Sequence, residues 1–140
     1  MNCSQIYIGV DIQLSESKSK VFSVELISDS DVEYAQLKSI LKRDFIYYLA
    51  PHTGCGCGWD VLHTETEYDE LSKQSLESLK VFLKTVSLNQ TVYLLASNQF
   101  AVGDIPGLET EVNTEKFIAS LGALRPKYGD SLAKLYLLKS

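Results

Sequence analysis

Two strand patterns follow one another at the start of the chain, with no helix pattern between them. Apolar residues alternate with others from Ile6 to Leu14, which is the period of a half-buried strand. Val21–Ile27 is a second apolar and β-branched run, and the polar stretch Ser15–Ser19 predicts a short connection. We therefore expect an N-terminal hairpin. Because parallel neighbours need a long crossover, usually a helix, this opening favours a mixed or antiparallel sheet.

Apolar spacing and end signals predict two helices in the first two thirds of the chain. The earlier one is expected to begin at a capping box formed by Ser30 and Glu33 and to end near Arg43, where a cation suits the helix dipole. The longer one is expected to begin after Thr66 and to reach Val86, because apolar residues recur there at helical spacing.

The remaining patterns complete the prediction of one domain. In chain order we expect a strand at Phe45–Ala50, a short strand at Trp59–Leu62, a strand at Thr91–Ala96, a long loop at Asn98–Asn113, a short helix at Thr114–Leu121 and a strand at Leu132–Leu138. No linker or repeat divides the sequence. It therefore predicts a single α+β domain over residues 1–140, with a mixed or mainly antiparallel sheet of about five to six strands and one long and two shorter helices packed mainly on one face.

One segment, Pro51–His63, holds both histidines of the chain and two of its three cysteines. Cysteine sulfur and histidine nitrogen are the donors that zinc prefers, usually in a tetrahedral set. The candidate zinc ligands are therefore His52, Cys55, Cys57 and His63. The Cys-x-Cys spacing is closer than in most structural zinc sites, so other interpretations of this segment stay open.

Three other interpretations fit the same residues. Cys55 and Cys57 can close a small, strained disulfide ring, which predicts a thiol-redox role. A cysteine with a neighbouring histidine as its base, oriented by Asp60 or Glu65, would be a catalytic nucleophile. Finally, the alternating glycines can form a tight turn in which the thiols are small buried groups and Trp59 packs on the core. We favour this packing interpretation, with no cofactor, over zinc, redox and nucleophile sites in that order.

The charge of the chain argues against nucleic acid and for a basic protein partner. The formal net charge is -5, and such a surface repels phosphate. Residues 44–72 and 85–115 contain acidic residues but no lysine or arginine. If these stretches meet in space, they form an acidic face that attracts cations; the favoured alternative is an ordinary solvated surface. The candidate partner-binding carboxylates are Asp60, Glu65, Glu67, Asp69, Glu70, Asp104, Glu109 and Glu111.

These observations predict a non-enzymatic binding or regulatory protein that engages a basic partner protein, as an immunity protein or a small inhibitor does. Its 8 tyrosines support this, because tyrosine is enriched at interfaces. The alternative is a zinc-binding or thiol-redox protein built on the segment from His52 to His63. With neither a secretion signal nor a long apolar run in the sequence, we expect a cytoplasmic protein without a membrane partner, and its oligomeric state stays open.

Overall fold

The computed structural model describes residues 5–54, 56–59, 67–97, 110–121 and 133–139. Its elements are β1 (Gln5–Val10), β2 (Ser17–Lys18), β3 (Phe22–Leu26), α1 (Tyr34–Leu41), β4 (Phe45–Pro51), the 3-10 helix η1 (Gly56–Trp59), α2 (Glu67–Ser87), β5 (Val92–Ser97), β6 (Thr110–Val112), α3 (Thr114–Ser120) and β7 (Ala133–Leu138). This order confirms the α+β class.

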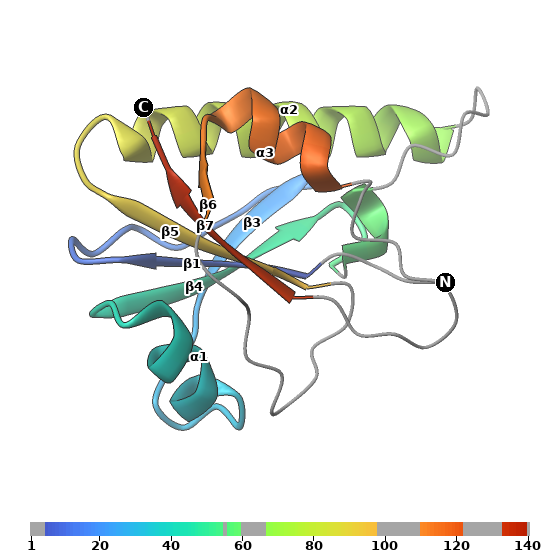
Figure 1. The fold of residues 1–140 in the computed structure, drawn as a ribbon. Helices are drawn as coiled ribbons and strands as arrows, with labels where there is room; N and C mark the ends of the chain where they lie inside the picture. Colours follow the sequence, from blue (N-terminus) through green and yellow to red (C-terminus); the bar gives the residue numbers. More distant parts are fainter. Residues whose placement is uncertain (1–4, 55, 60–66, 98–109, 122–132, 140) are drawn as a thin grey trace.

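The strands form one mostly antiparallel sheet (Figure 1). In the described residues it has seven strands in the order β2-β3-β4-β1-β5-β7-β6, and only β6 and β7 run parallel to each other. This is more strands than expected. The two additional strands are short: β2 lies in the stretch predicted as a connection, and β6 lies in the stretch predicted as a loop.

The predicted N-terminal hairpin is wrong, because β4 lies between β1 and β3. Leu49 of β4 is the register partner of both Ile6 and Val24. The alternation in β1 correctly predicts a strand, but Tyr7 on its other face is buried as well, which is typical of a central strand. The hairpin that does form joins β2 to β3 through a turn at Lys20 and Val21.

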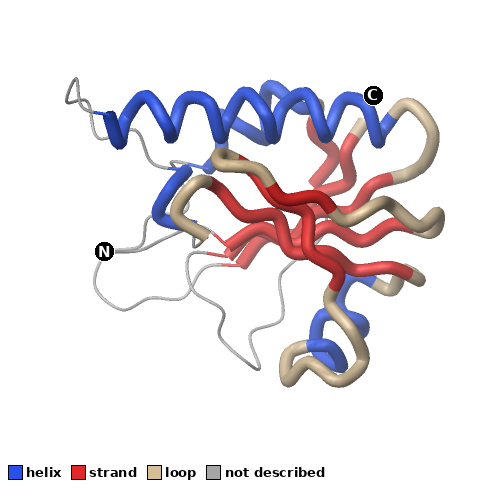
Figure 2. Tube along the Cα trace, turned by 180° about the vertical axis from the view of Figure 1, so that it is seen from behind, coloured by secondary structure: helices blue, strands red, loops and turns tan. Residues whose placement is uncertain are grey.

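Helices cover both faces of the sheet, as the two views in Figures 1 and 2 show. α2 and α3 pack on one face through an apolar cluster that includes Leu83 and Phe117, and α1 packs on the other face through Leu37 and Leu41. The prediction of packing mainly on one face therefore holds for two of the three described helices. None of the described helices is both long and apolar enough to cross a membrane.

The predicted helix ends are partly confirmed. α2 matches the expected long helix, and the side chain of Asn113 caps α3 by accepting from the Lys116 N–H at 2.8 Å. The capping box at Ser30 is wrong. Asp31 instead accepts a hydrogen bond from the Ser28 N–H at 2.7 Å, so residues 28–33 form a turn and α1 begins only at Tyr34. The expected strand at Trp59 is replaced by η1, and residues 60–62 lie outside the described chain.

Candidate functional site

The segment with the histidines and cysteines leaves the sheet at the end of β4 through a tight turn. The Gly54 N–H donates to the Pro51 carbonyl oxygen at 2.9 Å, and Gly54 has a φ of 77°, which favours glycine. The Tyr48 hydroxyl lies 3.1 Å from the Gly54 carbonyl oxygen. The turn leads into η1, which contacts both α2 and β4. The chain turns here because glycine adopts the positive φ of position 54 without strain, although there is room for a Cβ atom.

His52 is held against two buried serines of α2. Its backbone N–H donates to Ser75 Oγ at 3.0 Å, and its Nε2 lies 3.2 Å from Ser72 Oγ. Both serine side chains are fully buried. Burial lowers the pKa of His52 below its usual value, so its imidazole is neutral at neutral pH. A neutral imidazole can accept a proton or bind a metal.

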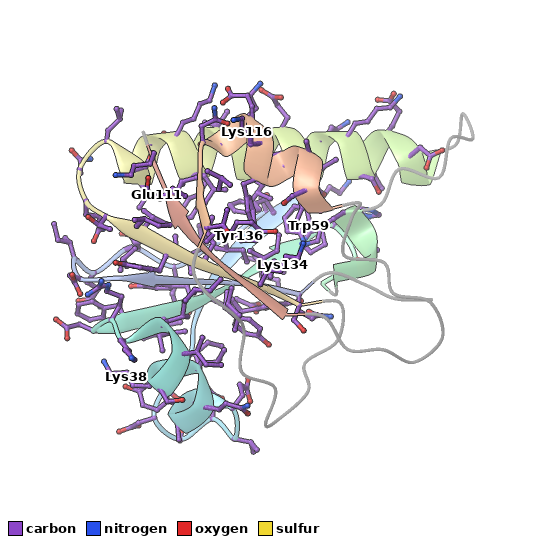
Figure 3. The ribbon with its side chains drawn as sticks, viewed as in Figure 1. Lys38, Trp59, Glu111, Lys116, Lys134 and Tyr136 are labelled. Carbon is purple, nitrogen blue, oxygen red and sulfur yellow. The ribbon has the colours of Figure 1, made fainter. Side chains whose placement is uncertain are left out.

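η1 is packed tightly into the space between β4 and the helix layer. A Cβ atom on Gly58 would lie 2.5 Å from Thr53 Oγ1 and 2.8 Å from Pro51 Cγ, so a larger residue does not fit there. Trp59 is only 3% exposed and lies between the sheet and the layer of α2 and α3 (Figure 3). Its indole N–H has no hydrogen-bond acceptor in the described part of the chain. Trp59 therefore packs in the core, as expected.

The proposed zinc and thiol chemistry falls mostly outside the described residues. Cys55 and His63 are not described, and for Cys57 only the place of its backbone in η1 is known. Among the residues that the structure describes, no three His, Cys, Asp or Glu side chains come together as metal ligands. Asp60 and Glu65, the proposed orienting groups, are also outside. The zinc, redox and nucleophile hypotheses therefore stay predictions.

The predicted partner-binding carboxylates are dispersed where the structure describes them. Asp69 is only 2% exposed, so its side chain is not part of an acidic surface, contrary to the prediction. Glu70 is exposed and lies 3.6 Å from Lys73, and Glu111 is exposed and lies 3.5 Å from Lys139. Glu67 begins α2 but its side chain is not described, and Asp60, Glu65, Asp104 and Glu109 lie outside the described residues.

Glu70 and Glu111 lie near opposite ends of α2. Glu70 is in the first turn of the helix, whereas Lys84 in its last turns lines a pocket together with Asn113 and Lys139, beside β6. The helix between Glu70 and Lys84 is roughly 21 Å long at 1.5 Å per residue. These two carboxylates therefore do not contribute to one common face.

A different group of carboxylates gathers on the α1 side of the sheet. Glu25 lies near the end of β3, Asp29 and Asp31 lie in the turn that follows, and Glu33 directly precedes α1. Within the described chain none of these four makes an ion pair. The ion pairs of the described residues involve other carboxylates: Asp11 with Arg43, Glu70 with Lys73, Glu111 with Lys139 and Glu115 with Lys84.

Tyrosines border this group of carboxylates. Tyr48 is the register partner of Glu25, and its ring centroid lies 5.3 Å from that of Tyr7. Burial, and then the charge of Glu33, raise the pKa of Tyr7 to about 12, so Glu33 acts on this part of the sheet. Tyr34 and Tyr48 are partly buried and pack on the same apolar cluster. We call this region the acidic tyrosine surface; it consists of Glu25, Asp29, Asp31, Glu33, Tyr34 and Tyr48.

This surface is not among the sites predicted from the sequence, although the sequence contains a signal for it. Residues 29–33 contain three carboxylates in five positions, but the spacing of Ser30 and Glu33 was interpreted as a helix cap. Val32, between two of these acids, is 95% exposed. Only the structure shows that this apolar side chain is almost fully exposed to water between charged neighbours.

The chain matches no protein-family model, and it has no significant similarity to a curated protein or to a solved structure. The functional proposal is therefore based on the geometry of this chain's own residues.

Proposed function

We propose that the protein is a non-enzymatic binding protein that engages a basic partner protein through the acidic tyrosine surface. The observation that carries this proposal is the set of four carboxylates without an ion pair in the described chain, beside partly buried tyrosine rings. Unpaired carboxylates attract and orient the lysines and arginines of a partner. Tyrosine adds contact area at low conformational cost because it has few rotatable bonds.

Two cations on the α1 side of the sheet, Lys38 and Arg43, make their described contacts away from these carboxylates. Lys38 Nζ donates to the Arg43 carbonyl oxygen at 2.5 Å, and the Arg43 guanidinium lies 4.1 Å from the centre of the Tyr93 ring. Lys38 is near the carboxyl end of α1, whereas the carboxylates precede its amino end. α1 therefore separates its charges along its axis.

Helix stabilisation explains only part of this arrangement. Acidic residues before a helix interact favourably with its dipole, which accounts for Asp31 and Glu33. It does not account for Glu25, which lies on a strand, or for the full exposure of Val32. Both fit a surface that a partner covers, with Val32 as an apolar contact between charged residues.

The experiment is co-purification at several salt concentrations with two matched variants. The surface variant carries Asp29→Asn, Asp31→Asn and Glu33→Gln; the control variant carries Glu70→Gln, Glu111→Gln and Glu115→Gln, which changes the net charge equally. We expect the wild type and the control to retain the same basic protein at low salt and to release it at high salt, because exposed charges are screened.

The surface variant should lose this partner at every salt concentration. Titration of the purified partner against each variant then measures the affinities directly. Equal affinity of the two variants, an acidic partner, or the absence of any partner at low salt would contradict the proposal.

A further inference from the structure

An apolar groove of about 570 Å³ lies between the tip of the β2–β3 hairpin and the middle of α2. Val21 and Phe22 line it from the hairpin, and Val81 and Phe82 line it from the helix. Val81 is 55% exposed, and the rings of Phe22 and Phe82 lie 5.4 Å apart between their centroids. Covering such a surface is favourable, because apolar area is removed from water.

The two rims of the groove carry opposite charges. Glu77 lines the groove on the helix side, and Lys20 lies beside Val21 at the tip of the hairpin on the other side. Both residues are exposed, and neither makes an ion pair within the described part of the chain. The groove therefore has one acidic rim and one basic rim.

Three neighbouring cations of α2 interact within the chain, and Lys80 is one of them, because its charge helps to lower the pKa of Glu115. Lys73 lies 3.6 Å from Glu70, and Lys84 pairs with Glu115 of α3 at 2.5 Å. The other helix residues that line the groove, Gln74, Ser78, Val81 and Phe82, are uncharged. An uncharged centre with charges at its border is the usual composition of a protein interface.

This arrangement is self-complementary. A two-fold axis that runs along the groove places the helix rim of one copy against the hairpin rim of the other, so that Glu77 meets the partner's Lys20 twice. A partner of a single sign of charge would be repelled at one rim. We propose that the groove is the contact surface of a symmetric homodimer, in which Val81 of each copy enters the groove of the other.

The dimer and the proposed function involve opposite faces of the sheet. The groove lies on the side of α2, and the acidic tyrosine surface lies on the side of α1. Figure 2 shows these two helices on opposite sides of the sheet. A dimer of this kind leaves both acidic tyrosine surfaces accessible to a partner. Dimerisation and partner binding can therefore fail independently of each other.

The first test is sedimentation velocity of the full chain over a range of concentrations. The wild type should sediment as a dimer, and Val81→Glu should sediment as a monomer, because the substitution places a charge in the apolar contact. Lys42→Glu, on the α1 side, should remain dimeric. A wild type that is monomeric up to about 100 μM, far above the dissociation constant of a specific interface of ordinary size, would overturn the proposal.

The second test exchanges the charges of the rims. Glu77→Lys and Lys20→Glu should each weaken dimerisation about tenfold, since each substitution replaces two attractions by two repulsions. An equimolar mixture of the two variants should recover the wild-type affinity, because both contacts again join opposite charges. A mixture that associates no more tightly than either variant alone would show that Glu77 and Lys20 do not meet across a two-fold axis.

Discussion

The two halves of α2 present different chemistry to the rest of the molecule. The buried residues of the carboxyl-terminal half are Leu79, Leu83 and Val86, and those of the amino-terminal half are Asp69, Ser72 and Ser75. The apolar half packs on the strands. The polar half receives the segment after β4, because Ser72 and Ser75 are the hydrogen-bond partners of His52.

The two halves of α2 therefore have different roles: one stabilises the fold, and the other positions the segment that carries His52. A buried polar group is costly unless it is hydrogen-bonded. Ser75 avoids this cost twice, since its Oγ accepts from the His52 N–H and donates to the Leu71 carbonyl oxygen at 2.9 Å. Burial of the apolar half stabilises the fold through contacts that have no required direction. The hydrogen bonds of the polar half have a required geometry, so they fix one conformation of the segment that carries His52.

The largest expected effect is in the apolar half. Leu83→Ala should lower the free energy of unfolding by about 2–5 kcal/mol, because it leaves a cavity at a fully buried site. Leu88→Ala, directly after the end of α2 at a site that is 76% exposed, should change it by less than about 0.5 kcal/mol. Urea denaturation measures both. Equal losses for the two variants would mean that α2 does not pack through this half.

A smaller but more local effect is expected in the polar half. Ser75→Ala should cost about 1–2 kcal/mol, because it leaves the N–H of His52 without its acceptor. Hydrogen exchange of the His52 amide should accelerate more than exchange in β5. Ser78→Ala, which is closer to the surface, is the matched control. Uniform acceleration throughout the molecule would remove the distinction between the two halves.

The pH dependence of stability tests the environment of His52. Its pKa is lowered in the folded protein, so below the usual histidine pKa of about 6.5 the unfolded chain binds more protons. The stability contributed by the neutral ring is present above that pH and is lost as the pH falls toward the folded-state pKa. His52→Gln should reduce this slope in denaturant titrations repeated at several pH values, and an unchanged slope would assign it to other groups.

The smallest effect is expected from a chelator. If the thiols after β4 are packing groups, removal of metal should leave the thermal midpoint unchanged and elemental analysis should find less than one zinc per chain. Stoichiometric zinc together with a lower midpoint in chelator would instead favour a metal centre at His52, Cys55, Cys57 and His63.

The sequence predicts the individual helices and strands better than it predicts which strands lie side by side. The long helix was predictable because its apolar spacing and its end charges agree. The partners of β1 were not, because alternation predicts a strand but does not show which strands lie beside it. Ser30 failed as a cap because Asp31 offers its carboxylate to the Ser28 N–H, so a local turn competes with the helix.

The candidate sites were less predictable for the same reason. Nothing in the sequence indicates that Ser72 and Ser75 are buried, since serines at helical spacing are also typical of an exposed face. Their role depends on His52, which is about 20 residues earlier in the chain and reaches them only in the folded protein. The acidic tyrosine surface likewise requires β3, β4 and α1 to come together.

The outermost strands of the sheet have a consequence for solubility at high concentration. β2 has two residues and β6 has three, so each outer edge offers few free backbone groups to an incoming strand. Directly before β2 begins, Glu16 Oε2 accepts from the Leu26 N–H at 3.2 Å and occupies a donor that another chain would otherwise use. Short edges of this kind offer few positions for strand addition, which is the step by which cross-β fibrils grow.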